Sequence, residues 1–160
     1  IDLMHARAER AGEKSWRFFL YGAAPGVAEE AAQKLKAMHP GIRIAGTSHG
    51  YLSSEDQKQL IEKIREVEPH ILFVALGAPK QEFWINRNLE QLGVPVCMGV
   101  GGSFDVIAGK IKRAPIFMQR AGLEWLYRLV REPKRFKRML ALPAFAAAVL
   151  FESMKQEKNE

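Results

Sequence analysis

The pattern of apolar and polar positions predicts four strands. Six consecutive apolar residues, Ile71 to Leu76, leave no polar face for water, which predicts a strand covered on both sides. The apolar run Val94–Val100 predicts a second buried strand. Two further strands are predicted at Arg17–Gly22 and, as a short strand, at Ile42–Gly46, each closed by a glycine.

Helical spacing predicts a helix before each of these strands. The apolar positions that define the first helix are Leu3, Met4, Ala8 and Ala11; two further helices pass through Ala32, Leu35 and Met38 and through Leu60, Ile64 and Val67. The last of these begins at the capping sequence Ser53-Ser54-Glu55-Asp56, and a fourth helix runs from Pro79 to about Leu92. The alternation predicts an α/β fold, a Rossmann-like parallel sheet with right-handed crossovers and helices on both faces.

Each predicted strand ends in a turn rich in glycine. The four turns are Gly22–Gly26, Gly46–Tyr51, Gly77–Gln81 and Gly99–Asp105. Because parallel strands end at the same edge of a sheet, we expect the turns to meet on one rim, where open α/β sheets bind ligands. The main-chain amides there favour phosphate, and Lys80 adds a positive charge.

The side chains in these turns suit a nucleotide. Tyr51 offers an aromatic face for a base, and Asp105 offers a carboxylate that accepts hydrogen bonds from a base or sugar. The simpler interpretation is a set of ordinary turns with a solvated lysine, a packed tyrosine and a helix-capping aspartate. Neither a dinucleotide fingerprint nor a P-loop is present, and the histidines, acids and cysteine show no metal-ligand spacing, so we expect no metal and no cofactor.

Length and composition indicate one core with a small appendage. The chain has 160 residues, 48% of them hydrophobic. The single cysteine, Cys97, excludes a disulfide framework and favours a reducing compartment, and no apolar run approaches the roughly 20 residues of a spanning helix. The helical pattern begins at once from Ile1, from which we expect the Rossmann-like domain, residues 1–112, to lack sequence upstream.

The basic residues are concentrated in the C-terminal part of the chain. The net charge is +6, yet Lys110–Arg138 contains ten basic residues against two acidic ones, a net +8. Residues 113–160 are therefore predicted to be a basic helical appendage that meets an acidic partner. Its short helices are predicted at Pro115–Arg120, at Gly122–Arg131 and from Pro133 onward. The thirteen-residue apolar run Met139–Phe151 follows them and is too short to span a bilayer.

Four motifs in this order resemble the WecG/TagA/CpsF glycosyltransferases. They are G-x-P-K-Q-E at Gly77–Glu82, G-V-G-G-S-F-D at Gly99–Asp105, A-G-K-x-K-R-A-P at Ala108–Pro115 and G-L-E-W-L-Y-R-L-x-x-E-P-x-R at Gly122–Arg135. The resemblance covers essentially the whole chain. It implies inverting, metal-independent transfer of an N-acetylmannosamine-type sugar from UDP to a polyprenyl-diphosphate-linked N-acetylglucosamine, as in teichoic acid or surface polysaccharide synthesis. The enzyme would lie peripherally on the inner face of the cell membrane.

The resemblance also implies roles for individual residues. Tyr51 and Asp105 match positions that hold the uracil end of the donor, and Gln81 lies in the site motif. The full expected donor site is Gly22, Tyr51, Gly77, Lys80, Gln81, Gly102 and Asp105, and the residues expected at the lipid diphosphate are Arg128, Arg135 and Arg138. The family's proposed catalytic aspartate matches no position here and is expected upstream of Ile1. No base is therefore assigned, and we expect little activity from residues 1–160 alone.

Two other classes of function remain open at this point. One is a non-catalytic nucleotide-binding α/β domain, and the other is a nucleic-acid-binding module that uses the basic segment. The stacking aromatics expected of a nucleic-acid-binding sheet are not evident, so the partners we expect are a UDP-sugar, the lipid-linked acceptor and an anionic membrane surface, without nucleic acid. The sequence leaves association into a homo-oligomer open.

Overall fold

The chain divides into two compact units, Ile1–Lys112 and Arg113–Glu160. The computed structural model describes residues 1–131, apart from the side chains at positions 12, 13, 128 and 131. Each unit forms a compact body of its own.

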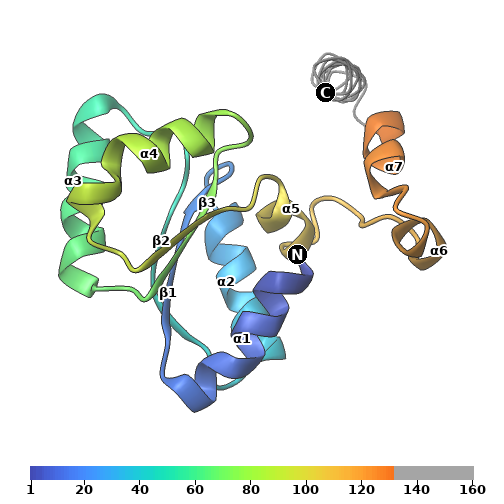
Figure 1. The fold of residues 1–160 in the computed structure, drawn as a ribbon, viewed down its shortest axis with the longest axis horizontal. Coiled ribbons are helices and arrows are strands. Elements are labelled where there is room, and N and C mark those ends of the chain that lie inside the picture. The colour runs from blue at the N-terminus through green and yellow to red at the C-terminus, as the bar shows by residue number, and fades with distance from the viewer. Residues whose placement is uncertain (132–160) are drawn as a thin grey trace, which may run out of the picture. The chain divides into compact units, whose positions relative to one another are not determined.

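Four parallel strands form the sheet of the first unit (Figure 1). They are β1 (Arg17–Gly22), β2 (Arg43–Ser48), β3 (Ile71–Ala75) and β4 (Val96–Gly99). Their order is β2-β1-β3-β4, and the β1–β3 register places Phe18 opposite Ile71 and Gly22 opposite Ala75. The chain moves toward one side of the sheet from β1 to β2 and toward the other from β3 to β4. The point at which the strand order reverses, where open α/β sheets bind ligands, therefore lies between β1 and β3.

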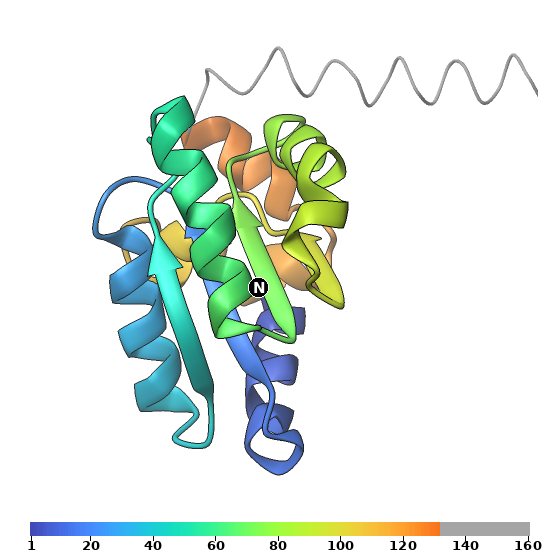
Figure 2. The same cartoon turned by 90° about the vertical axis from the view of Figure 1, so that its left-hand side faces the viewer.

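Helices cover both faces of this sheet (Figures 1 and 2). The helices of one face are α1 (Asp2–Lys14), α2 (Val27–Met38) and α5 (Ser103–Ile107), and those of the other are α3 (Ser54–Val67) and α4 (Lys80–Leu92). The predicted Rossmann-like α/β fold is thus confirmed.

The strand β3 shows why its sequence is apolar throughout. Ile71, Phe73 and Ala75 pack into the core shared with α1, α2 and α5, whereas Leu72 and Val74 pack into the core shared with α3 and α4. Full burial of each large apolar side chain contributes about 1.5–3 kcal/mol, so a polar residue at any of these positions would be costly. The predicted burial of this strand on both sides is confirmed.

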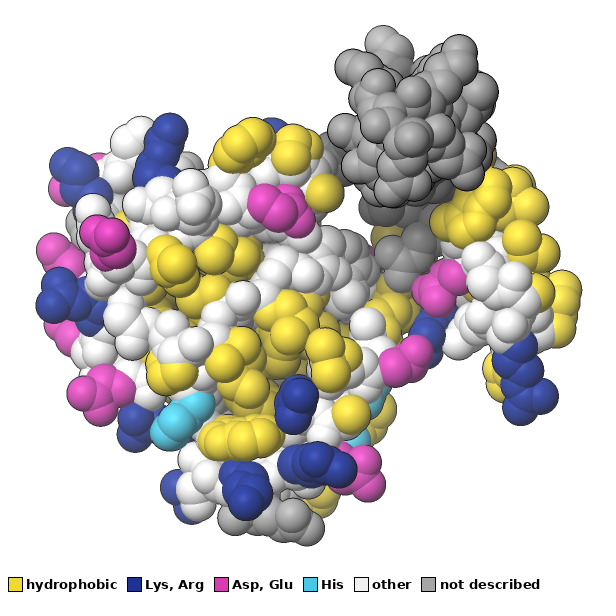
Figure 3. All heavy atoms as spheres, viewed as in Figure 1, with side chains coloured by type: hydrophobic (Ala, Val, Ile, Leu, Met, Phe, Trp, Pro, Cys, Tyr) yellow, Lys and Arg dark blue, Asp and Glu magenta, His cyan; other side chains and the backbone are white. Residues whose placement is uncertain are grey.

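The strand β4 differs from its prediction. It spans Val96–Gly99 instead of Val94–Val100, and the side chain of Val96 is 43% exposed. The prediction of a buried strand was wrong because β4 is an edge strand among residues 1–131, with β3 on one side. On the face shown in Figure 3, apolar side chains gather across the middle of the first unit, with charged side chains around its margin.

The helix ends follow local chemistry. In α1, Met4, Ala8 and Ala11 are buried as the pattern predicts, but Leu3 is exposed. The predicted cap of α3 is a complete capping box: Ser53 Oγ accepts from Asp56 N at 3.2 Å, and the Asp56 carboxylate accepts from Ser53 N at 3.4 Å. The helix α4 begins at Lys80, one residue later than predicted, with Pro79 as its N-cap.

Two short helices are described in the second unit. They are α6 (Ile116–Arg120) and α7 (Glu124–Arg131), each starting one or two residues after its predicted start. An ion pair of 3.5 Å joins Arg113 to Glu124. Across residues 1–131, no helix has both the length and the apolar character needed to cross a bilayer. The helix predicted from Pro133 and the apolar run Met139–Phe151 lie outside the described residues.

Candidate functional site

The loops after three of the strands are joined by main-chain hydrogen bonds. Ala23 N donates to Ala75 O at 2.8 Å, which connects the loop after β1 to the end of β3. Gly50 N donates to Ala23 O at 2.9 Å, which folds the loop after β2 back onto the loop after β1. The strand-end turns therefore meet at one edge, as expected of parallel strands.

Gly22 permits the closest of these approaches. Its φ is +126°, and a Cβ there would lie 2.5 Å from both the carbonyl carbon and the oxygen of Ala75. Main chain cannot yield in the way that a flexible side chain can, so only glycine fits. Gly50 is less strictly required, since its Cβ would lie 2.6 Å from the end of the flexible Leu76 side chain and 3.2 Å from Gly22 Cα. The structure therefore gives Gly22 a packing role.

The loop after β4 is held from α4. Gln81 is only 5% exposed, and its Oε1 accepts from Gly101 N at 2.9 Å. Its Nε2 donates to Glu82 Oε1 at 2.8 Å. A Cβ on Gly99 would lie 2.5 Å from that Nε2. Sequence reasoning placed Gln81 at the site but missed these contacts.

The helix that carries Asp105 is fastened at both ends. At its start Ser103 Oγ donates to Val100 O at 2.6 Å. After its end Lys34 Nζ donates to Ala108 O at 2.6 Å. An ion pair of 2.8 Å between Lys110 and Glu30 provides a second tie to α2. These contacts hold α5 against α2, with the Asp105 side chain partly exposed.

Tyr51 is an exposed aromatic side chain. It is 77% exposed, so the interpretation of a packed core tyrosine is wrong. Its main-chain N–H donates to Nδ1 of His49 at 3.3 Å. The loop that carries it follows the edge strand β2 but folds back onto Ala23. Tyr51 therefore belongs to a loop beside the centre of the sheet edge.

The remaining expected donor residues lie at the starts of helices. Gly77, with φ +76°, accepts from Gln81 N at 3.1 Å in the turn before α4. Lys80 is the exposed first residue of α4, and Gly102 is the N-cap of α5. These three positions thus offer main-chain groups and one positive charge.

The structure arranges the expected residues around the loop after β1. The Tyr51 loop is bonded to this loop, and α5 packs against α2, which follows it directly. Tyr51 and Asp105 follow the two edge strands of the described sheet; the Tyr51 loop bonds to Ala23, and the helix of Asp105 packs on α2, which follows Gly26. In the second unit, Arg128 lies on α7 with its side chain outside the description, and Arg135 and Arg138 lie outside the described residues.

A partly buried carboxylate near the same edge was not anticipated. Glu29, in the first turn of α2, accepts from Thr47 Oγ1 of β2 at 3.2 Å through Oε1. Its Oε2 is buried and has no hydrogen-bond partner within residues 1–131. An acidic residue in the first turn of a helix is common, so the sequence contained no signal for this arrangement.

Other groups with chemical potential lie elsewhere. Nδ1 of His5 and Nε2 of His39 are 3.1 Å apart, but the described part of the chain holds no group of three or more potential metal ligands. Burial raises the pKa of the Cys97 thiol, which keeps it protonated near neutral pH and disfavours a role as a nucleophile.

These features define an open, Rossmann-like α/β domain with a glycine-rich edge at the reversal of strand order, the edge at which domains of this class bind ligands. Sequence comparison then makes the assignment more specific. The chain belongs to the glycosyl transferase WecG/TagA/CpsF family, which it matches over residues 1–159. The predicted resemblance is confirmed.

Two curated relatives of the chain have the same name, N-acetylglucosaminyldiphosphoundecaprenol N-acetyl-beta-D-mannosaminyltransferase. The relative from Bacillus spizizenii is 45% identical over 149 residues, which are 93% of this chain and 57% of the relative. The relative from Bacillus subtilis is 43% identical over 150 residues, 94% of this chain and 56% of the relative. The chain thus spans a little over half the length of these curated relatives.

Proposed function

We propose that this chain supplies the donor-binding domain of a glycosyltransferase that moves an N-acetylmannosamine-type sugar from UDP to a polyprenyl-diphosphate-linked N-acetylglucosamine. The observation that carries the proposal is the glycine-rich edge between β1 and β3, to which the Tyr51 loop is bonded, together with the packing of the Asp105 helix on α2. Membership of the family supports glycosyl transfer as the reaction class, and the names of the two relatives support the lipid-linked acceptor.

In this proposal the donor lies along the sheet edge. The exposed ring of Tyr51 stacks on the uracil, and the Asp105 carboxylate accepts hydrogen bonds from the base or ribose. The diphosphate lies toward the start of α4, a thirteen-residue helix whose free main-chain amides and positive dipole end favour anions. Lys80, at the first position of that helix, adds a full positive charge.

These groups suit the departure of UDP. Breaking the anomeric C–O bond leaves the electron pair on the diphosphate, and positive charge beside it stabilises the transition state. The attacking hydroxyl of the acceptor must lose a proton to a base, and attack from the opposite face inverts the anomeric centre. We assign that base to none of the described residues. The matched part is only 57% of the first relative's length, so the rest of such a protein is a natural source.

The second unit is proposed to meet the lipid-linked acceptor at the inner membrane face. The exposed apolar side chains of α6, α7 and the turn between them are Ile116, Phe117, Leu123, Trp125, Leu126 and Val130. Apolar side chains gather on the visible part of these helices in Figure 3. Arg128, Arg135 and Arg138 are proposed to bind the lipid diphosphate, because arginine forks match its oxygens. Replacing the three with alanine should reduce use of the acceptor and leave UDP affinity largely intact.

The test of the donor site is calorimetric titration with UDP, ADP and NAD. UDP should bind most tightly, and Tyr51→Ala should weaken it by about tenfold, because stacking of a base on an aromatic ring is worth about 1–3 kcal/mol. The matched control is Phe117→Ala, which removes an equally exposed aromatic ring from the second unit. Equal or tighter binding of NAD, or equal effects of the two variants, would contradict the proposal.

A further inference from the structure

Both polar atoms of the Gln81 side-chain amide are hydrogen-bonded to other residues of the protein. Its Oε1 receives the main-chain N–H of Gly101, and its Nε2 is bonded to the Glu82 carboxylate. The residue is only 5% exposed, although its partner Glu82 is exposed on α4 and its partner Gly101 is partly exposed in the loop after β4. A buried amide with these partners is suited to holding main chain in place.

Glycines in the loop after β4 leave room for the Gln81 side chain. Gly99, the last residue of β4, leaves the space that the amide fills: a Cβ at Gly99 would lie 2.5 Å from Nε2, 2.9 Å from Cδ and 3.1 Å from Cγ of Gln81. Gly101, whose N–H donates to Gln81, has φ +53°, a left-handed conformation that glycine adopts readily. The glycines of this loop thus serve the contact with α4.

The held loop leads directly into the helix of Asp105. Val100 N donates to Val74 O at 2.8 Å, which fixes the start of the loop on β3. Gly101 is then fixed by Gln81, and Gly102 is the N-cap of α5. Because Asp105 is the third residue of α5, a shift of Gly101 would move its carboxylate along the sheet edge.

We propose that Gln81 is a positioning residue that sets the Gly99–Gly102 loop, and with it Asp105, for donor binding without touching the donor. The inference rests on the proposed function, since it takes a UDP-sugar as the molecule that Asp105 meets. It assigns the glutamine of the G-x-P-K-Q-E motif to the architecture of the site. A direct contact between Gln81 and the donor is the alternative that the experiment must separate.

Exchanging glutamine and glutamate between positions 81 and 82 distinguishes a positioning role of Gln81 from a direct contact with the donor. In Gln81→Glu the carboxylate still accepts from Gly101 N, but it faces the Glu82 carboxylate across a contact of 2.8 Å. Repulsion between these like charges should displace the side chain and weaken UDP binding by about tenfold. In the double variant Gln81→Glu/Glu82→Gln, the new glutamine donates to the new carboxylate. The Gly101 bond is then preserved, and the net charge equals that of the wild type.

We expect Glu82→Gln to restore most of the UDP affinity that Gln81→Glu loses. The loss caused by Gln81→Glu should be at least fivefold smaller in the Glu82→Gln background than in the wild-type background, as measured by calorimetry with UDP. If Gln81 touched the donor through its amide N–H, the double variant would remain as weak as Gln81→Glu. That outcome would overturn the inference.

A second pair of variants tests the same contact from the other side. Gly99→Ala should weaken UDP binding, because the new methyl group displaces the Gln81 amide. Combined with Gln81→Ala, which empties that space, Gly99→Ala should cost little further affinity. Additive losses would contradict the inference. Thermal unfolding of each variant identifies any that fail to fold. If one of them fails, the Gln81→Glu and Gln81→Glu/Glu82→Gln variants decide the question.

The readouts also separate this inference from the proposed function. Hydrogen exchange at the Gly101 amide should become at least tenfold faster in Gln81→Ala, whatever the ligand. Wild-type protein that fails to bind UDP would overturn the proposed function. Wild-type protein that binds UDP, with unchanged Gly101 exchange in Gln81→Ala, would overturn only the role of Gln81.

Discussion

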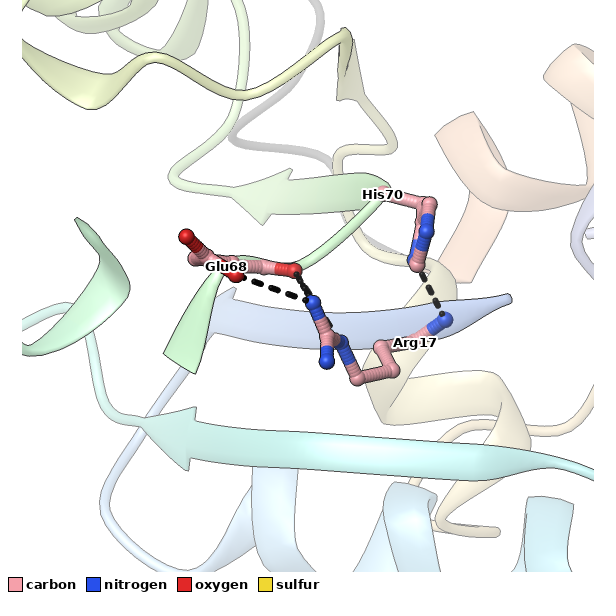
Figure 4. Close-up of polar contacts among 3 residues, drawn as sticks. All are labelled: Arg17, Glu68 and His70. Atoms are coloured by element: carbon pink, nitrogen blue, oxygen red, sulfur yellow. Dashed lines mark hydrogen bonds and ion pairs between the residues drawn. The ribbon is translucent and has the colours of Figure 1, made fainter. Parts of the chain in front are cut away.

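Arg17 and His70 are joined by a reciprocal pair of hydrogen bonds at the edge of the sheet opposite the strand-end loops, and Figure 4 shows the one made by the His70 ring. The main-chain N–H of Arg17 donates to Nδ1 of His70 at 3.0 Å, and the main-chain N–H of His70 donates to Arg17 O at 2.8 Å. The Arg17 guanidinium also donates to Glu68 O, from Nη2 at 2.6 Å and from Nε at 3.1 Å. The entries to the central strands β1 and β3 are thereby aligned.

Removal of the His70 ring should destabilise the first unit. His70→Ala leaves the Arg17 N–H without its acceptor, and loss of such a partner costs about 1–3 kcal/mol of unfolding free energy. The control is Arg17→Met, which keeps the main-chain N–H and removes only the solvent-exposed guanidinium contacts with Glu68, and should cost less than about 1 kcal/mol. Urea denaturation measures both, and equal costs would show that the main-chain bond contributes little.

Gly22→Ala should be far more damaging than Gly26→Ala. Both glycines have positive φ, +126° and +83°, so alanine is strained at both. A Cβ at Gly26 would meet nothing within 4 Å, whereas a Cβ at Gly22 would collide with Ala75 main chain at 2.5 Å. The difference in thermal or urea stability between the two variants isolates the collision. Similar stabilities would mean that β1 and β3 can move apart freely.

Tyr21 should make stability depend on alkaline pH. Burial raises the pKa of Tyr21 from 10.0 to about 12. Between these two values the unfolded chain has lost the tyrosine proton while the folded chain retains it, so the contribution of Tyr21 is fully present below pH 10 and is lost as pH rises toward 12.

The matched variant for this effect is Tyr21→Phe, which keeps a ring beside Trp84, where the ring centroids are 4.6 Å apart. Its unfolding free energy should fall less steeply between pH 10 and pH 12 than that of the wild type, because phenylalanine has no proton to lose. Chemical denaturation at a series of pH values gives the comparison. Parallel curves would show that the Tyr21 hydroxyl ionises as easily in the folded protein as in the unfolded chain.

The apolar side chains of α7 should contribute a part of vesicle binding that salt does not weaken. We expect Trp125→Ala/Val130→Ala to lower this part severalfold on anionic phospholipid vesicles, because each side chain is exposed and loses its contact with the acyl region. The charged part, about 1 kcal/mol for each arginine near the surface, should decline as salt increases.

The control for the vesicle measurement is Leu3→Ala/Met38→Ala. It removes two exposed apolar side chains from the first unit and should leave vesicle binding unchanged. Sedimentation with vesicles at low and high salt separates the two components. Loss of all binding at high salt in the wild type would argue against an apolar contribution from α7.

Local patterns in the sequence were sufficient for the class of fold. The apolar run Ile71–Leu76 predicted a strand buried on both sides, and the order of helices and strands predicted a parallel sheet with a glycine-rich edge. The cap of α3 at Ser53–Asp56 was also evident, since the residues of its capping box are three positions apart. Such features depend on near neighbours in the chain and on solvent exposure averaged over an element.

The tertiary structure decided which of these residues actually meet. Apolar spacing could not show that Val96 is on an edge strand, because strand order depends on crossovers between distant segments. It could not show that Gln81 holds Gly101, twenty positions further along, or that Gly22 is required by Ala75, more than fifty positions away. These contacts arise where separate loops approach within a few ångströms, and hydrogen bonding and steric repulsion act only over that range.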